Sequence, residues 1–266
     1  MSVAEATLPS SSHKRKAEYS ILAVGVLLAV VYAYGQSNLE FIGFFSNVIT
    51  PVEALAAFAM AILMLKTYSG DKGGGMSRVY VSYSLGIGLW FLAECTWTTY
   101  TLLVRIEIPY PSIADLFWLV GYVPLLVAFL LQAWPFREVF VSKKQISLTL
   151  TMFVMSALIL IVTIPPLFQP NQDPVTLAVS LAYPFLDTLL LAVAIPVFLV
   201  FRKGSYWRPT LFVILGIMLQ LAGDLLFNQA FYSGTYYAGS PADLIFDYSY
   251  LMLALGFYKG LKLNLY

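Results

Sequence analysis

The sequence predicts an all-α protein, a polytopic membrane bundle of eight transmembrane helices. Its composition is the first observation behind this prediction, since 60% of the 266 residues are hydrophobic and only 11% are charged. A soluble domain is about 45–50% apolar and about 25% charged. This chain has too few polar side chains to cover a water-exposed surface, so lipid must be its main solvent.

Eight apolar stretches are the second observation, because each is close to or longer than the roughly 20 residues that cross a bilayer. They run over residues 19–35, 39–67, 77–104, 112–134, 146–167, 174–201, 209–232 and 241–258. We expect residues 1–18 to form a cytoplasmic tail and residues 19–263 to form one membrane domain. The basic start and first apolar run also fit a signal peptide cut near Gly35.

The distribution of Lys and Arg is the third observation. Fourteen of these 15 residues fall on one side of an eight-helix topology, and Arg105 alone falls on the other. Lys and Arg concentrate in cytoplasmic loops. The pattern therefore predicts eight spans with both termini cytoplasmic, in a plasma membrane.

The rare residue types exclude several functions. One cysteine, Cys95, and one histidine, His13, exclude a disulfide framework and any metal site built from Cys or His pairs. The net charge of +1 excludes a strongly basic nucleic-acid binder. The sequence indicates no particular cofactor.

Two segments resemble each other and predict an internal repeat. Residues 111–122 and 240–250 both place Ala-Asp-Leu at the start of a helix, around Asp115 and Asp243. Acidic residues upstream match as well, Glu94 with Asp224, and Pro51-Val52-Glu53 with the segment 184–187. The predicted halves, about 19–134 and 146–263, each hold an even number of spans, so the repeat is parallel. Short apolar segments also match by chance, which is the competing interpretation.

Seven carboxylates lie inside the predicted spans, where ionisable residues are costly and are functional candidates. The predicted topology places all of them in the outer half of the membrane or near its midplane. Clustered carboxylates either hold protons or attract cations. They are Glu53, Glu94, Asp115, Asp187, Asp224, Asp243 and Asp247.

Each carboxylate also has a structural interpretation. Asp115 and Asp243 follow a serine at capping-box spacing, and Glu53 fits the same pattern if its helix starts late. Glu94, Asp187 and Asp224 lie too far inside helices for capping, so they would be interhelical hydrogen-bond acceptors.

Prolines within two long spans indicate a cavity. Pro51 and Pro184 remove backbone donors and leave carbonyls that need partners. We expect an outward-facing pocket in which Glu94, Asp187 and Asp224 share one cavity. Trp97 and Tyr183 join the seven carboxylates as expected ligand-binding residues, and such a lining suits a small organic, lipid or cationic ligand.

Three segments carry a resemblance to known families. The segments 111–122, Ala-Tyr-Pro-Phe-Leu-Asp at 182–187 and Gly-Ser-Pro-Ala-Asp-Leu at 239–244 are similar to the multi-helix N-terminal sensor regions of prokaryotic diguanylate cyclases, phosphodiesterases and histidine kinases. The chain ends at Tyr266 without an output domain, so the resemblance implies signalling through a separate partner. Ala-Gly-Asp-Leu-Leu at 222–226 more faintly resembles lysoplasmalogenase-type membrane hydrolases.

The sequence therefore favours a receptor-like sensor module with a membrane or cytoplasmic signalling partner. One alternative is a small proton- or cation-coupled transporter, which the repeat and the midplane acids support. Another is an intramembrane lipid-modifying enzyme, with Glu94 and Asp224 as general base and acid. A structural subunit of a larger membrane complex is the remaining interpretation.

Overall fold

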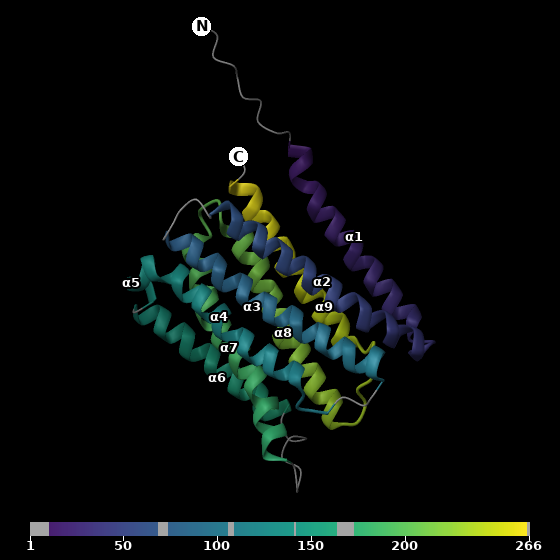
Figure 1. Ribbon diagram of the computed structural model, residues 1–266. Helices are drawn as coiled ribbons and strands as arrows, with labels where there is room; N and C mark the ends of the chain where they lie inside the picture. The colour runs from purple at the N-terminus through teal and green to yellow at the C-terminus, as the bar shows by residue number, and fades with distance from the viewer. Residues whose placement is uncertain (1–10, 69–73, 106–108, 141, 164–172, 265–266) are drawn as a thin grey trace.

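The computed structural model describes residues 11–68, 74–105, 109–140, 142–163 and 173–264, and this part of the chain is helical without strands (Figure 1). The predicted all-α class is confirmed. Eight long helices are joined by short connections, and a π-helical turn (Thr99–Val104), a 3-10 turn (Trp134–Phe136) and the short α5 (Arg137–Phe140) complete the described elements. The long helices are α1 (Ser11–Gly35), α2 (Leu39–Thr67), α3 (Gly75–Thr98), α4 (Ile113–Ala133), α6 (Lys143–Thr163), α7 (Pro174–Phe201), α8 (Trp207–Tyr232) and α9 (Pro241–Asn264).

The helix bounds agree closely with the predicted spans. α2 and α7 match their predicted ranges, because Asn38 and Asp173 accept backbone N–H groups at their first turns. α1 begins at Ser11, eight residues earlier than the predicted span, so part of the predicted tail is helical. Residues 1–10 of that tail and residues 164–167 of the fifth predicted span lie outside the described residues.

Four helices are long and apolar enough to cross a membrane, which supports a membrane protein. They are Leu39–Thr67, Ile113–Phe136, Pro174–Phe201 and Trp207–Tyr232, and Tyr19–Gly35 is a shorter apolar helix. The buried carboxylates of α3 and α9 lower the apolar content of those two helices. The count of eight spans stays a prediction.

The outer faces of the bundle are apolar, unlike those of a soluble protein. Large apolar side chains are exposed on its outer faces, for example Val123 (62%), Leu150 (59%) and Leu85 (58%). All seven carboxylates of the predicted spans are instead at most 8% exposed. Apolar outer faces with the carboxylates buried inside the bundle suit contact with lipid.

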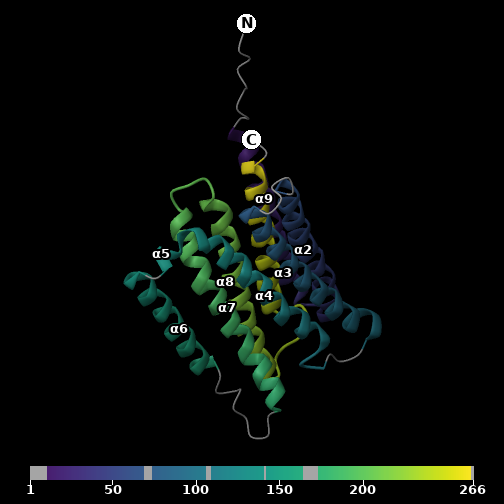
Figure 2. The same ribbon diagram turned by 60° about the vertical axis from the view of Figure 1, so that its left-hand side comes forward.

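Six helices surround the core, and two lie at its edge. α3 packs most extensively on α4 and α8 on α9, while α2 contacts α9 and α3, and α7 contacts α8 and α4. Figure 1 shows α6 at one side and α1 at the other, and α6 packs on α7 whereas α1 packs on α9 and α2. The start of α1 and the end of α9 lie at the same end of the bundle in Figures 1 and 2.

Glycines allow the two closest helix pairs to approach. A Cβ on Gly86 of α3 would lie 2.5 Å from Leu125 Cγ of α4, and a Cβ on Gly216 of α8 would lie 2.7 Å from Leu253 Cγ of α9. Both positions also face a backbone carbonyl of the partner helix at 3.0 Å. Small residues at such contacts bring helix backbones together in membranes.

We predict that Gly86→Ala and Gly216→Ala each destabilise the protein by about 1–3 kcal/mol, because the added methyl group overpacks a contact whose carbonyl cannot move aside. Thermal unfolding in detergent measures the effect. Gly75→Ala is the matched control, because nothing lies within 4 Å of its Cβ position. Equal melting temperatures for all three variants would contradict the prediction.

Candidate functional site

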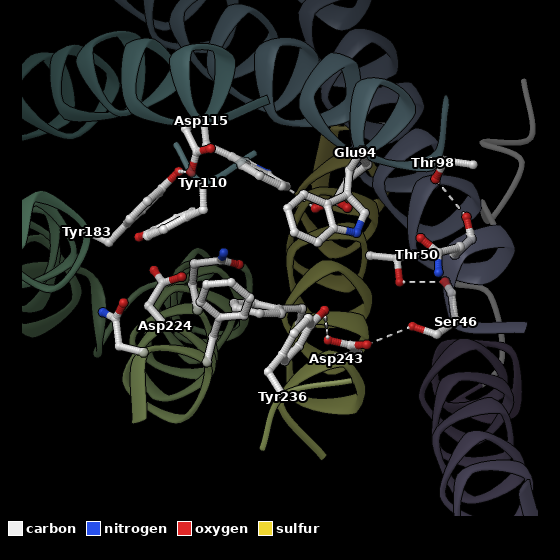
Figure 3. A pocket seen from close by; sticks show the side chains of 17 residues that line it. Ser46, Thr50, Glu94, Thr98, Tyr110, Asp115, Tyr183, Asp224, Tyr236 and Asp243 are labelled. Carbon is white, nitrogen blue, oxygen red and sulfur yellow. Dashed lines mark hydrogen bonds between the residues drawn. The ribbon is translucent and has the colours of Figure 1, made fainter. Parts of the chain in front are cut away.

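A cavity of about 80 Å³ lies where α3 and α8 end and α4 and α9 begin. We call it the acidic cavity, because its lining includes a carboxylate from each of these four helices (Figure 3). They are Glu94, Asp115, Asp224 and Asp243. α2 contributes Ser46, Asn47 and Thr50, so both halves of the chain build the cavity.

Six of the nine predicted binding residues line the acidic cavity, namely the four carboxylates with Trp97 and Tyr183. Glu53, Asp187 and Asp247 are also buried, at most 5% exposed, but they are not part of the lining. The cavity therefore brings Glu94 and Asp224 together, whereas Asp187 lies behind them.

Asp115 is held by the start of its own helix and by a neighbouring helix. Its Oδ2 accepts the backbone N–H of Ser112 at 2.6 Å and the Ser112 hydroxyl at 2.9 Å, which completes a capping box. Its Oδ1 accepts from Tyr183 Oη at 2.8 Å. Both carboxylate oxygens are thus occupied by protein donors.

Asp243 is held in a similar way, with one difference from the predicted capping box. Its Oδ2 accepts the Gly239 N–H at 2.6 Å and the Ser46 hydroxyl at 3.1 Å, and its Oδ1 accepts from Tyr236 at 3.2 Å. The Ser240 hydroxyl, the expected capping partner, has no hydrogen bond. The carboxylate instead secures the turn before the helix.

Glu94 and Asp224 have fewer partners. Glu94 Oε1 accepts from Tyr250 Oη at 2.7 Å and from the Trp118 indole at 3.3 Å, so the predicted interhelical hydrogen bonds exist. Asp224 Oδ2 accepts from Tyr122 Oη at 3.4 Å, and the Asp224 carboxyl group also contacts that of Asp187. These two lining carboxylates keep oxygens that no protein N–H or O–H group satisfies.

Three carboxyl groups lie behind the lining, and they form two pairs, one of them with the lining residue Asp224. Asp187 accepts from Tyr122 at 2.8 Å, contacts Asp224, and has no protein donor for its Oδ2. Glu53 contacts Asp247, and neither Glu53 oxygen has a donor. Two adjacent buried carboxyl groups remain together when they share a proton.

The predicted capping role of Glu53 is wrong. α2 begins at Leu39 rather than after Thr50, so Glu53 lies mid-helix, about four turns after the first residue of the helix. Asp247, its neighbour, accepts from Thr50 and Tyr32, each at 2.7 Å.

The carbonyls that the two prolines free are satisfied beside the cavity. Pro51 cannot donate to the carbonyl of Asn47, and that oxygen accepts from Thr98 Oγ1 at 2.7 Å. Pro184 likewise frees the carbonyl of Ser180, which accepts from Asn228 Nδ2 at 3.1 Å. Both donors, Thr98 and Asn228, line the acidic cavity, so the predicted link between the prolines and a cavity is confirmed.

Aromatic rings form much of the remaining wall. Trp97 lies 5.8 Å from Trp118, and Phe227 lies 4.7 Å from Tyr236, between ring centroids. Sequence reasoning missed three lining aromatic residues, Tyr110, Tyr236 and Phe246. Two of these come from the connections between helices, where apolar periodicity gives no signal. Burial raises the pKa of the loop residue Tyr110 above its ordinary value.

A second cavity of about 250 Å³ lies at the opposite end of the same helices, and we call it the inner cavity. Tyr68 and Tyr206 share a hydrogen bond of 2.9 Å across it, and Tyr83 donates to Gln132 at 3.1 Å. Its lining contains no Asp, Glu, Lys or Arg among the described residues. No sequence pattern indicates this cavity, because scattered tyrosines also fit the aromatic belts of a membrane protein.

Metal binding has no support in the described part of the chain, where no three His, Cys, Asp or Glu side chains are arranged to hold an ion. Comparisons with protein-family models, curated proteins and solved structures find no match to this chain. The resemblance to sensor regions is therefore an expectation from sequence motifs.

We predict that Asp115→Asn destabilises the protein by about 1 kcal/mol, because an amide nitrogen cannot accept the helix-capping bonds. Glu94→Gln is expected to leave stability unchanged, since the amide oxygen can keep both hydrogen bonds. Thermal unfolding at pH 7 in detergent measures both variants. An equal loss in both would show that Glu94 is as structural as Asp115.

Proposed function

We propose that this chain is a receptor-like membrane module that binds a small ligand from the outer side and signals through a partner protein. The acidic cavity is the observation that carries the proposal. It gathers four carboxylates and an aromatic wall from both halves of the chain, and two of the carboxylates, Glu94 and Asp224, have oxygens left for a ligand.

In the proposed topology, eight helices span the plasma membrane and both termini are cytoplasmic. Basic residues support this arrangement. Lys66 lies in the last turn of α2, Arg78 near the start of α3 and Lys262 in the last turn of α9, all at the end of the bundle where α1 starts. Arg105 follows the π-helical turn at the other end. Lys and Arg are enriched in cytoplasmic loops. The end of the bundle that carries more of them is therefore the cytoplasmic end in the proposed topology.

We further propose that the chain is a parallel repeat of four helices and four helices. Equivalent contacts support it, starting with the prolines. Pro51 frees a carbonyl that Thr98 of α3 satisfies, and Pro184 frees one that Asn228 of α8 satisfies. Gly86 against Leu125 and Gly216 against Leu253 are a second such pair.

The hydrogen bonds between the halves support the repeat as well. Tyr250 of α9 donates to Glu94 of α3, and Tyr122 of α4 contacts Asp224 of α8. Tyr250 follows Asp243 by seven residues, as Tyr122 follows Asp115. A pseudo-twofold axis along the membrane normal would exchange these contacts, and it would pass through the acidic cavity.

The closed core below the cavity supports a receptor over a carrier. Trp90 lies between Tyr122 and Tyr250, with ring centroids 5.3 and 6.4 Å away. All three rings are at most 2% exposed. A ligand in the acidic cavity meets this layer instead of a path to the other side.

The inner cavity favours a carrier as the second candidate function. It faces the acidic cavity across the Trp90 layer, and the same helices, α3, α4, α8 and α9, contribute to both. Alternating access in repeat-built transporters uses such opposed cavities. A carrier would have to separate Tyr83 from Phe129 and Phe257, whose ring centroids lie 5.4 and 5.3 Å from its own.

We predict that Phe227→Cys in a Cys95→Ser background reacts with a membrane-impermeant maleimide added outside intact cells. The thiol would line the acidic cavity, which opens outward in the proposed topology. Met76→Cys, at the inner cavity, should react only after permeabilisation. Ile217→Cys is the control for burial, because Ile217 is on the same helix as Phe227 and is 2% exposed.

Labelling of Phe227→Cys only after permeabilisation would reverse the orientation and overturn the outward pocket. No labelling of Phe227→Cys even in detergent would show that the cavity is closed, which contradicts ligand binding there. If a substrate drives Met76→Cys and Phe227→Cys to exchange accessibility, the carrier replaces the receptor.

A further inference from the structure

The polar groups around the acidic cavity are divided unequally into donors and acceptors. Most of its hydroxyl hydrogens are already donated to protein oxygens. Ser46 donates to Asp243, Tyr183 to Asp115, and Thr98 to a backbone carbonyl. Thr50, Tyr236 and the Trp118 indole are used in the same way. The remaining side-chain donors without a partner are the Trp97 indole and the Gln220 amide.

The groups left over are mainly acceptors. Asn228 is 7% exposed and lines the cavity, and its amide nitrogen donates to the carbonyl of Ser180. That bond fixes the orientation of the amide, so its Oδ1 is an acceptor, and no protein group donates to it. Glu94 uses one oxygen for its hydrogen bonds, and Asp224 accepts only the 3.4 Å contact from Tyr122 besides its contact with the Asp187 carboxyl group. A buried acceptor without a donor is costly, so the cavity is complementary to a ligand that brings N–H or O–H groups.

The charge of the lining points the same way. Four carboxylates line the cavity, and no Lys, Arg or His is among its lining residues. The faces of Trp97, Trp118 and Phe227 add the negative quadrupole that attracts cations. An anionic ligand would meet repulsion from every side of this cavity.

The size of the cavity limits the ligand. At roughly 10–15 Å³ of such space per water, the cavity of about 80 Å³ accommodates about five to eight waters or one compact head group. An acyl chain or a planar multi-ring compound would need a larger space.

We propose that the acidic cavity binds a small primary ammonium compound, whose N–H groups donate to Asn228 Oδ1, Glu94 and Asp224. This inference rests on the proposed function only in requiring that the cavity open to the outer side. It adds the chemical class of the ligand, a compact cation with at least two N–H donors.

The test uses the full-length protein in nanodiscs and four compounds of similar size at constant ionic strength. Ethylammonium has charge and N–H donors, tetramethylammonium has charge alone, propionamide has donors alone, and propionate has the opposite charge. Ethylammonium at ten times its dissociation constant should raise the melting temperature by about 3 °C. The other cation and the amide should bind at least tenfold more weakly, and propionate should not bind.

Variants locate the binding. Glu94→Gln and Asp224→Asn should each weaken ethylammonium binding about tenfold, and Glu40→Gln should not change it. Glu40 is the matched control, because it is an exposed carboxylate in the first turn of α2 at the same end of the bundle. Asn228→Leu removes the unpartnered acceptor with little change in volume. If it fails to fold, the four-compound series on the wild type still tests the proposal.

Propionate or propionamide binding as tightly as ethylammonium would overturn the inference and leave the receptor proposal intact. Ethylammonium binding that is equally strong in Glu94→Gln and Glu40→Gln would also overturn it. No binding by any compound, together with an unreactive Phe227→Cys, would remove both the inference and the proposed function. No binding with a reactive Phe227→Cys removes the inference alone.

Discussion

The structure depends on how two interrupted helices satisfy their backbone. In a lipid environment every carbonyl needs a donor from within the protein, and Pro51 and Pro184 each remove one. The protein supplies the replacements from neighbouring helices, Thr98 for one carbonyl and Asn228 for the other. At these two positions polar side chains take the place of the missing N–H groups. Thr98 and Asn228, the donors of these two hydrogen bonds, both line the acidic cavity.

The same constraint separates the carboxylates into those that hold the fold and those with unused oxygens. Asp115 and Asp243 accept hydrogen bonds from helix starts and from tyrosines. Each of these carboxylates therefore links the start of its helix to a neighbouring segment. Glu94 and Asp224 have fewer partners. A site with incomplete hydrogen bonding inside a well-packed bundle is less stable than an apolar one of equal volume, and binding recovers that loss.

Much of the fold could be predicted from sequence, because long apolar runs and capping residues such as Asp173 determine where membrane helices begin and end. The cavity was predictable only in outline. Which face of a helix a small polar residue occupies depends on the rotation of the helix in the bundle, so Ser46 and Thr98 gave no signal by themselves. The role of Gly239 was also hidden. Its positive φ of 86° lets its N–H point at Asp243, and a Cβ there would lie 2.8 Å from Ile42.

The contacts that α2 and α3 make with the last helix, α9, have a consequence for biosynthesis. Thr50 and Asp247 are 197 residues apart in the chain, and Tyr250 is 156 residues beyond Glu94. A ribosome therefore releases Glu94 of α3 into the insertion machinery long before its donor Tyr250 is made, and it releases the donor Thr50 long before the carboxylate of Asp247. Until α9 is inserted, these early helices lack those hydrogen-bond partners. Insertion of the last helix is then the step that commits the whole bundle to its native packing.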